Sequence, residues 1–237
     1  MGGTLMRIDI LSLFPAVFTG FLNESILARA IKNDLVEVNI IDYRTFSNSK
    51  HLKVDDYPFG GGAGMVLQVQ PVVDALRSIQ GYEEAIKILV TPQGETFKQE
   101  KAYQLSAKTH IIILCGHYEG YDERIRDYFD LELSIGDYVL TGGELAAMVL
   151  VDAITRVIPN VISKDESHQF DSFNNDLLEH PHYTRPREFE GKTVPDVLLN
   201  GNHKLIEEWR LKESINRTKQ RRPDLYKKYI KGGKYHE

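Results

Sequence analysis

Apolar and polar positions along the first two thirds of the chain follow a pattern that predicts strands separated by helices. Apolar residues alternate as in a strand over residues 7–14, and Pro15 then opens a helical pattern that runs to about Ile31. Further strands are predicted at residues 36–43, 85–90, 109–115 and 138–140, and further helices at 71–80, 99–106, 122–129 and 144–156. This rhythm predicts an α/β fold with a mostly parallel sheet that is covered by helices on both faces.

The last third of the chain has a different character. Apolar periodicity disappears over residues 163–176, where polar residues dominate, and helical patterns return over residues 196–199 and 204–222. We therefore predict a first domain over residues 1–162, a flexible linker over residues 163–176 and a small all-α domain over residues 177–237.

The predicted helix over residues 204–222 is basic. Its pattern would turn Leu205, Trp209 and Ile215 inward. Three arginines at i, i+7 and i+11 would share one stripe of this helix: Arg210, Arg217 and Arg221. Residues 201–237 hold 11 Lys or Arg against 5 Asp or Glu, whereas the whole chain has a formal net charge of −5. A basic end on an acidic body is typical of a protein that binds a polyanion such as RNA, although a solvated helix face gives the same pattern.

Composition argues against several classes of protein. The 237 residues are 42% hydrophobic, which is enough for a core without covalent cross-links. The single cysteine, Cys115, cannot form an internal disulfide, and its place in an apolar strand favours a core residue over a nucleophile. No apolar run approaches the roughly 18 residues of a membrane span, and the start of the chain lacks the pattern of a secretion signal. We expect a cytoplasmic protein that does not bind a membrane.

Three of the predicted strands lie beside glycine-containing turns. TPQG (residues 91–94) follows the apolar run AIKILV, and CGHYEG (residues 115–120) follows THIIILC. SIGDYVLTGGE (residues 134–144) has Gly142 and Gly143 directly before a predicted helix. Glycine lets main-chain amides approach a ligand without interference from a Cβ atom. We therefore expect the three turns to meet at one crevice that suits a nucleoside.

Three other patterns do not support the chemistry that they suggest. EGKTV (residues 190–194) resembles the end of a phosphate-binding P-loop, but Pro186 stands where that motif needs a glycine. FGGGAGM (residues 59–65) lacks the dinucleotide-binding spacing because Met65 stands at the third glycine position, so it is either a tight turn or a loop that contacts a ligand. The eight histidines lack partners at metal-ligand spacing, so we predict no metal site.

Together these segments resemble the bacterial tRNA (guanine-N1-)-methyltransferase family, one of the knotted, SPOUT-type methyltransferases. The resemblance runs from Met6 to about Leu225 and rests on blocks in the same order: DYPFGGGAGM, TPQG, CGHYEGYDERI, SIGDYVLTGGELAAM, HPHYTRP, VPDVLLNGNH, WRLKES and RRPDL. It implies methyl transfer from S-adenosylmethionine to N1 of the guanosine at tRNA position 37, beside the anticodon. It also implies a deep trefoil knot, which general topology rules disfavour, and a homodimer whose active site lies between the subunits. The partner would be tRNA and not DNA.

The resemblance assigns roles to individual residues. The donor pocket would be lined, mostly by backbone, by Leu89, Thr91, Pro92, Gly94, Gly116, Tyr118, Glu119, Ile135, Gly136, Tyr138, Leu140, Gly142 and Gly143. Glu119 is the carboxylate suited to the sulfonium or amino group of the donor. Contacts to tRNA would come from Asp55, Gly64, Ser172, His182, Arg185, Arg210 and Arg217. The resemblance is compatible with Mg²⁺, although the sequence shows no carboxylate cage for this ion.

Methyl transfer to guanine N1 requires a base and a cation, because N1 carries a proton at neutral pH and its removal leaves negative charge toward O6. The resemblance assigns the base to Asp171 and the cation to Arg156. Without the resemblance Asp171 is one more acid in a polar linker, and His168 is a rival base because histidine titrates nearer to neutrality. A base in a flexible segment would be ordered only when tRNA docks.

Two features depart from the family pattern. His117 stands where some members have arginine, and the chain ends soon after RRPDLYKKY, so we expect reduced helices at the end of the second domain. Two other functions stay open: a non-catalytic tRNA-binding module that keeps the nucleoside pocket, and a nucleotide hydrolase suggested by the glycine loops. The presence of Arg156, Asp171 and Glu119 together argues against the first, and the failed P-loop argues against the second.

Overall fold

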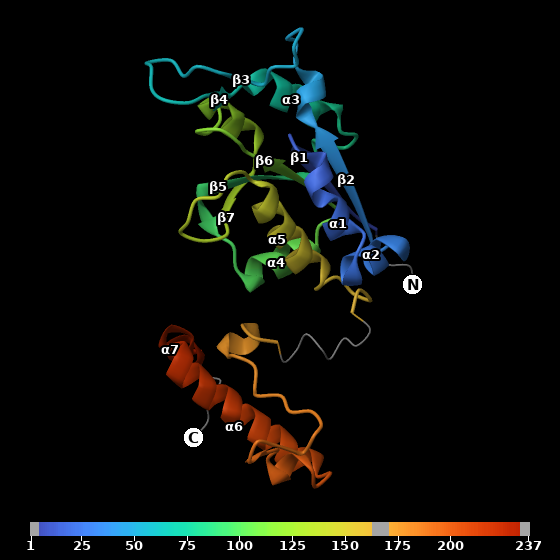
Figure 1. The fold of residues 1–237 in the computed structure, drawn as a ribbon, viewed down its shortest axis with the longest axis vertical. Helices are drawn as coiled ribbons and strands as arrows, with labels where there is room; N and C mark the ends of the chain where they lie inside the picture. The colour runs from blue at the N-terminus through green and yellow to red at the C-terminus, as the bar shows by residue number, and fades with distance from the viewer. Residues whose placement is uncertain (1–4, 163–170, 233–237) are drawn as a thin grey trace. The chain divides into compact units, whose positions relative to one another are not determined.

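A computed structural model describes residues 5–162 and 171–232 of the chain (Figure 1). The chain divides into two compact units, Met1–Ser163 and Lys164–Glu237. The division falls at the start of the predicted linker, whose residues 163–170 lie outside the described residues. His168, the rival base, therefore lies outside them as well.

The first unit is built on a five-stranded sheet in which all neighbouring strands are parallel. Its strand order is β2-β1-β6-β5-β7. The strands are β1 (Met6–Ser12), β2 (Val36–Asp42), β5 (Ile86–Thr96), β6 (His110–Cys115) and β7 (Leu131–Ser134). Parallel strands need crossover connections, which place helices on the faces of the sheet and bury apolar runs from both sides. The predicted α/β fold with a parallel sheet is confirmed.

Helices cover both faces of this sheet (Figure 1). One face packs against η1 (Pro15–Phe18), α1 (Thr19–Leu22), α2 (Ser25–Lys32), α4 (Gln99–Ser106) and α5 (Glu144–Thr155). The other face packs against η2 (Tyr43–Phe46), α3 (Val69–Ser78) and η3 (Glu123–Tyr128). Successive side chains of a strand point to opposite faces, so Ile10 of β1 joins the first core and Leu11 joins the second.

The strand predicted at residues 138–140 is wrong. These residues form no strand, and Val139 is 86% exposed. The sheet instead ends with β7, whose Leu133 is buried in the core and pairs with Val90 of β5. The apolar triplet at residues 138–140 has the sequence pattern of a strand, but it follows the turn at Gly136 and lies outside the sheet.

Next to the end of β6, a 3-10 helix replaces a predicted α-helix, and a short ribbon that was not predicted flanks the glycine-rich loop. The helix predicted at residues 122–129 is the 3-10 helix η3, which Asp122 caps by accepting a hydrogen bond from the backbone nitrogen of Arg124 at 3.0 Å. β3 (Asp55–Asp56) and β4 (Val66–Leu67) pair as antiparallel strands, and β4 bridges to the segment before η3. This ribbon holds both ends of the FGGGAGM loop.

The second unit contains two helices and a small hairpin. α6 (His203–Arg221) packs against α7 (Pro223–Lys231), and the remaining turns are η5 (Asn174–Asp176) and η6 (Asp196–Leu198). β8 (Glu188–Phe189) and β9 (Lys192–Thr193) pair around Glu190 and Gly191, which both have positive φ, as a tight hairpin turn requires. The hairpin departs from the prediction of an all-α domain. In the described ranges no helix has the apolar length that crossing a membrane requires.

α6 confirms the helix predicted at residues 204–222, but its buried face differs from the prediction. Leu205 is 44% exposed, whereas Ser214 and Thr218 are buried. The Thr218 hydroxyl donates to the carbonyl oxygen of Ser214 at 2.6 Å and accepts from the backbone nitrogen of Leu178 at 2.8 Å. Hydrogen bonding therefore decides part of this face, and an apolar pattern does not reveal it.

Candidate functional site

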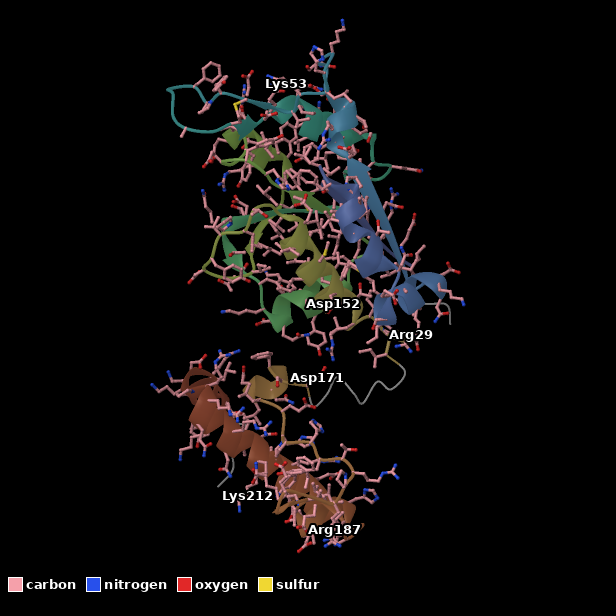
Figure 2. All side chains as sticks on the ribbon, viewed as in Figure 1. Arg29, Lys53, Asp152, Asp171, Arg187 and Lys212 are labelled. Atoms are coloured by element: carbon pink, nitrogen blue, oxygen red, sulfur yellow. The ribbon has the colours of Figure 1, made fainter. Side chains whose placement is uncertain are left out.

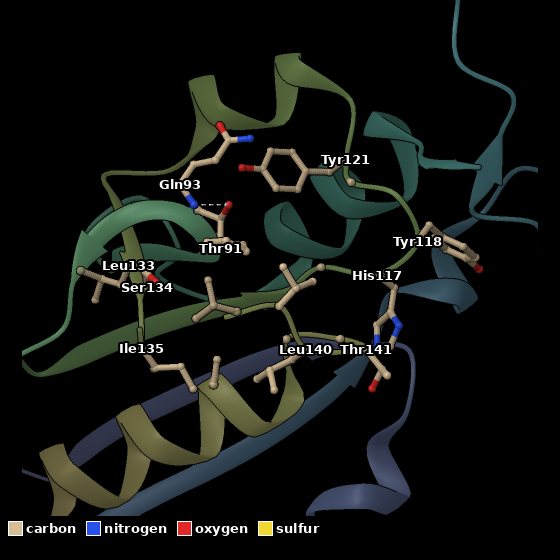
Figure 3. A pocket seen from close by; sticks show the side chains of 18 of the residues that line it. Thr91, Gln93, His117, Tyr118, Tyr121, Leu133, Ser134, Ile135, Leu140 and Thr141 are labelled. Carbon is tan, nitrogen blue, oxygen red and sulfur yellow. Dashed lines mark hydrogen bonds between the residues drawn. The ribbon is translucent and has the colours of Figure 1, made fainter. Parts of the chain in front are cut away.

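A cavity of about 360 Å³ opens beside residues 90–93 of β5 and at the carboxyl ends of β6 and β7. It is lined by residues 91–93 of β5 and by the glycine-containing turns that follow β6 and β7, and Figure 3 shows Thr91, Gln93 and Tyr121 across the cavity from Ile135 and Leu140. The carboxyl ends of parallel strands share one edge of a sheet, where α/β proteins bind ligands. The prediction that the three glycine-containing segments meet at one crevice is confirmed, but TPQG continues β5 and is not a turn that follows a strand.

Most of the residues that the resemblance assigns to the donor pocket line this cavity: Thr91, Pro92, Gly116, Tyr118, Glu119, Ile135, Gly136, Tyr138, Leu140, Gly142 and Gly143. Leu89 and Gly94 are not part of its lining. Leu89 is fully buried in the core on the α3 side of the sheet. A Cβ atom at Gly94 would lie 2.5 Å from the backbone of Glu132 and Leu133, so this glycine allows β5 and β7 to approach each other.

The cavity lining also includes residues that the sequence analysis did not assign to it, among them Gln93, His117, Tyr121 and Arg126. Arg126 donates to the side-chain oxygen of Gln93 at 2.7 Å, and its guanidinium carbon lies 5.3 Å from the ring centroid of Tyr121. An ion pair with Glu132 balances its charge. The sequence could have identified Gln93, His117 and Tyr121 as cavity residues, because they lie in or beside the glycine-containing segments, which gave a usable signal. Arg126 comes from η3 and offered none.

Gly142 and Gly143 form a cavity wall that lies against the end of β6; we call these two residues the glycine wall. The backbone nitrogen of Gly143 donates to the carbonyl oxygen of Gly116 at 2.9 Å. A Cβ atom at position 143 would lie 2.7 Å from the Cα atom of Cys115 and 2.8 Å from a methyl group of Val90. The sheet edge therefore accommodates only glycine at this position, and α5 begins directly after it.

Beside the glycine wall, Glu144 is a buried carboxylate with two side-chain partners. It is 6% exposed. The Ser12 hydroxyl donates to its Oε1 atom at 2.7 Å, and Nε2 of His117 lies 2.7 Å from its Oε2 atom. Ser12 in turn accepts a hydrogen bond from the backbone nitrogen of Phe14 at 3.0 Å. The network joins the end of β1, the turn after β6 and the start of α5.

The FGGGAGM loop is attached to the rim of the cavity. The backbone nitrogen of Glu119 donates to the carbonyl oxygen of Met65 at 3.0 Å. Gly64, with φ of +83°, lies so close to Glu119 that a Cβ atom there would come within 2.9 Å of the carboxylate oxygen Oε1. Phe59 in the same loop is completely exposed. The loop is therefore fixed at its second end and presents an aromatic side chain to solvent.

Asp55 and Tyr118 interact on the same rim. Burial raises the pKa of Tyr118, and the negative charge and hydrogen bonding of Asp55 raise it further, because ionising a phenol beside a carboxylate is unfavourable. Tyr118 has a φ of 66°, an uncommon conformation for a residue with a side chain. Two of the residues assigned to tRNA thus lie beside the cavity. Asp55 interacts with Tyr118 and Gly64 lies against Glu119, and both of these partners line the cavity.

In the second unit, three of the residues assigned to tRNA converge on Glu179. The backbone nitrogen of Glu179 donates to the Ser172 hydroxyl at 3.1 Å. Arg217 donates to the carbonyl oxygen of Glu179 at 3.2 Å, and His182 pairs with the Glu179 carboxylate at 2.8 Å. The other two assigned residues are exposed: Arg185 and Arg210. Figure 2 shows nitrogen-tipped side chains along α6, including Lys212.

Several cationic side chains lie around His180 in this unit. Burial lowers the pKa of His180, and the positive charges of His182, Arg210 and Arg217 lower it further, while Glu179 opposes them. Because burial is the largest cause, the shift shows only that these cations lie close enough to His180 to oppose a positive charge on it. The predicted basic character of the second unit is therefore present around α6.

The two residues assigned to catalysis belong to different units. Asp171 is half-buried and lies just before η5 (Figure 2). Arg156 is half-buried and follows the last residue of α5, where its backbone nitrogen donates to the carbonyl oxygen of Asp152 at 3.0 Å. The 12 residues of α5 span about 18 Å. Arg156 therefore lies at the end of α5 that is remote from the glycine wall.

Cys115 is a core residue, as predicted. It is fully buried, and burial raises the pKa of its thiol well above the usual value, so the reactive thiolate is disfavoured. Within residues 5–162 and 171–232, no three His, Cys, Asp or Glu side chains are grouped as ligands of a metal ion.

Comparison with known proteins agrees with this geometry. Residues 6–228 match the family described as tRNA (Guanine-1)-methyltransferase TrmD. The tRNA (guanine-N(1)-)-methyltransferase of Anoxybacillus flavithermus is 56% identical over 227 residues, which cover 94% of this chain and 93% of that protein. Proteins of the same name from Geobacillus kaustophilus and Bacillus subtilis are 56% and 55% identical over the same shares. The chain therefore belongs to the tRNA (guanine-1)-methyltransferase family.

Proposed function

We propose that this chain transfers the methyl group of S-adenosylmethionine to N1 of the guanosine at tRNA position 37, next to the anticodon. The observation that carries the proposal is the cavity beside β5 and at the ends of β6 and β7, which is lined by residues that the resemblance assigns to the methyl donor. The family match over residues 6–228 supports the same activity, since its description is a tRNA methyltransferase.

The cavity suits a nucleoside-sized methyl donor. Its volume of about 360 Å³ lies at the lower end of the range for small-molecule sites. The glycine wall leaves main-chain groups open to a ligand, Ile135 and Leu140 supply apolar surface, and Glu119 supplies a carboxylate for a cationic group. When bound, S-adenosylmethionine supplies an electrophilic methyl group on a positively charged sulfur.

The chain supplies the base and the cation for the acceptor. Asp171 accepts the proton of guanine N1, and Arg156 stabilises the negative charge that develops toward O6. A positioned general base contributes about 10² to 10⁴ in rate, and one charge stabiliser about 10² to 10³. Both residues are carried over from the family pattern, and the methyl-transfer rates of their variants test these roles.

The length of α5 supports an active site that is shared between two subunits. The glycine wall precedes the first residue of α5, whereas Arg156 follows its last residue, about 18 Å away. An arginine side chain is too short to bridge that distance within one chain. We therefore propose that each cavity receives Arg156 from the partner subunit of a homodimer, together with the partner's Asp171.

An exposed apolar surface beside the cavity supports the homodimer. Leu145 and Val149 lie one turn apart on α5, and Phe14 and Val17 lie at η1, which packs near α5. All four are at least 45% exposed. Large apolar side chains gathered in this way are typical of a protein–protein interface. Sedimentation of the full chain at micromolar concentration tests the dimer, and a monomer would contradict it.

The path of the chain after β7 supports a trefoil knot. β5 continues past the cavity edge, and its end pairs with Ser134. From there the chain returns to the middle of the sheet, where Gly143 bonds to Gly116 and α5 packs against β6 and β1. We propose that this return passes through the loop that connects β5 to β6. An experimental structure whose backbone path is unknotted, so that it would straighten fully if its two ends were pulled apart, would contradict this proposal.

The residues assigned to tRNA fall into two groups that suit different parts of an RNA. Asp55, Gly64 and the loop that carries Phe59 lie at the cavity rim, where an unstacked base would enter. Ser172, His182, Arg185, Arg210 and Arg217 lie on the basic second unit, where they contact phosphates. We thus propose a knotted donor-binding domain over residues 1–162, a linker over 163–176 and a tRNA-binding domain over 177–237.

Location and metal dependence follow from the same proposal. A tRNA substrate places the enzyme in the cytoplasm, which cell fractionation would test. The resemblance allows a role for Mg²⁺. If EDTA abolishes methyl transfer and Mg²⁺ restores it, while binding of S-adenosylhomocysteine is unchanged, the ion acts in the RNA-dependent step.

A methyl-transfer assay tests the proposed function. The full chain is incubated with labelled S-adenosylmethionine and unmodified tRNA that has guanosine at position 37, and the product nucleosides are separated. We expect N1-methylguanosine, and none from the matched transcript with adenosine at that position. A chain that binds tRNA but transfers no methyl group would be the non-catalytic module, and one that releases phosphate from a nucleotide would be the hydrolase.

A further inference from the structure

TPQG (residues 91–94) is a bulge within β5. Leu133 of β7 pairs with both Val90 and Glu95, so the four residues between them stand out from the ladder that joins the two strands. Three of these residues line the cavity: Thr91, Pro92 and Gln93. Bulges interrupt the regular pairing of a strand and re-aim its side chains, and they are common beside active sites. The β5 side of the cavity therefore depends on what holds this bulge in shape.

Arg126 of η3 joins the bulge to the neighbouring strand. Its guanidinium donates to the side-chain oxygen of Gln93 at 2.7 Å and also to the carboxylate of Glu132 in β7. The backbone of Glu132 lies against Gly94, the last residue of the bulge, where a Cβ atom would come within 2.5 Å of it. These contacts close a ring around the bulge, which we call the bulge ring: Arg126, Gln93, Gly94 and Glu132.

The charge of Arg126 is engaged inside the protein. In addition to Glu132, the carboxylate of Glu123 lies 2.9 Å from the Nε atom of Arg126, so two carboxylates face one guanidinium. A guanidinium presents its donors in a rigid fork, which allows it to hold several acceptors at once. Arg126 is therefore suited to holding protein segments together, and less suited to binding an anionic group of a ligand.

Tyr121 supports Arg126 from the side of the cavity. The guanidinium carbon of Arg126 lies 5.3 Å from the Tyr121 ring centroid, which is within the range of a cation–π interaction. Figure 3 shows the hydroxyl end of Tyr121 directed toward Gln93, with Ile135 and Leu140 on the opposite side of the cavity. The bulge thus faces apolar side chains, which suit the nucleoside part of the methyl donor and not its charged amino-acid part.

We propose that Arg126 is a positioning residue that holds the TPQG bulge through the bulge ring, so that the cavity is already shaped for the nucleoside part of the methyl donor. The inference rests on the proposed donor site. Arg126 acts through the bulge and not on the reacting atoms. A site that must be ordered before its ligand binds loses affinity in proportion to the fraction of competent protein. Loss of the bulge ring should therefore weaken donor binding and leave the rate of the bound complex unchanged.

The experiment measures binding of two ligands to the full chain by titration calorimetry. S-adenosylhomocysteine contains both the nucleoside and the amino-acid part of the donor, whereas 5′-methylthioadenosine contains only the nucleoside part. Arg126→Met removes the donors and keeps the length of the stem, Gln93→Met removes the acceptor, and a double variant combines them. Thermal melts confirm that each variant is folded. Gln93 is exposed, so Gln93→Met provides the same test if Arg126→Met does not fold.

Arg124→Met is the matched control. Arg124 belongs to the same 3-10 helix and pairs with Asp122 at 2.6 Å, but it is not part of the cavity lining. Its removal therefore deletes an arginine and an ion pair from η3 without touching the bulge ring. We expect Arg124→Met to bind both ligands as the wild type does.

We expect Arg126→Met and Gln93→Met each to weaken the binding of both ligands by about 5- to 30-fold, because hydrogen bonds that involve a charged group are among the stronger ones in proteins. The double variant should bind no more weakly than Arg126→Met alone, since the two residues act through one contact. In the methyl-transfer assay, the KM for S-adenosylmethionine should rise, while kcat stays within about twofold of the wild type.

Three results would overturn the inference while leaving the donor site intact. Wild-type affinity in a folded Arg126→Met variant would mean that the bulge does not need the bulge ring. Weakening confined to S-adenosylhomocysteine would mean that Arg126 binds the amino-acid part directly. Effects that multiply in the double variant would mean that Arg126 and Gln93 act separately. A wild type that binds neither ligand would instead overturn the proposed function and this inference with it.

Discussion

The backbone nitrogen of Gly143 donates a hydrogen bond to the carbonyl oxygen of Gly116 at a distance of 2.9 Å. This bond links the start of α5 to the turn after β6, although β7 stands between them in the chain and lies at the edge of the sheet. It brings two of the glycine turns together in one cavity wall. The cavity therefore depends on how closely these two backbones approach.

The first prediction concerns that approach. In Gly143→Ala, the new Cβ atom would lie 2.7 Å from the Cα atom of Cys115, so the wall must move away from β6. We expect binding of S-adenosylhomocysteine to weaken by at least about 10-fold, with a lower melting temperature. Gly20→Ala is the control, because nothing lies within 4 Å of its added Cβ atom. Unchanged binding in Gly143→Ala would mean that the donor does not use this wall.

The second prediction separates the two candidate bases. Asp171→Asn should lower the rate of methyl transfer by about 10² to 10⁴, because the amide cannot accept the N1 proton. Binding of S-adenosylhomocysteine should stay at the wild-type level. His168→Ala should retain activity in single-turnover measurements. The reverse pattern, an active Asp171→Asn and a silent His168→Ala, would transfer the role of base to His168.

The third prediction concerns the sharing of the active site between subunits. Gly143→Val removes the donor wall and Arg156→Ala removes the cation, so each homodimer alone should be inactive. If each site combines the cavity of one subunit with Arg156 of the other, mixed dimers contain one complete site. Equal co-expression should then restore about a quarter of the wild-type activity, measured as methyl transfer per chain. No recovery in a verified mixed dimer would contradict the shared site.

The fourth prediction concerns the exposed loop aromatic. Phe59 is 102% exposed on a loop whose far end is bound to the cavity rim at Glu119. Stacking of an RNA base on an aromatic ring is worth about 1–3 kcal/mol, so Phe59→Ala should weaken tRNA binding by roughly 5- to 150-fold. Phe59→Trp should restore binding, and neither change should affect S-adenosylhomocysteine. Equal tRNA binding by all three proteins would remove Phe59 from the RNA interface.

Local patterns in the sequence were sufficient for the framework of the first unit. The apolar runs that became β5 and β6 are buried from both sides, and such runs identify central parallel strands. Gly142 and Gly143 marked the start of α5 because glycine before a helix signals a close backbone approach. The short strand β7 was missed because its mixed sequence, Leu131–Ser134, has a weaker local signal than the exposed apolar triplet that follows it.

The sequence by itself determined the order of most strands and helices in the first unit, the three glycine-containing segments at the cavity and the basic character of the C-terminal part. It did not determine which distant side chains meet. Ser12 and Glu144 are 132 positions apart and still share a hydrogen bond, and His117 completes their network from a third turn. Only the tertiary structure decided this contact, because periodicity reports the environment of neighbours along the chain, whereas the parallel sheet brings the ends of its separate strands to one edge.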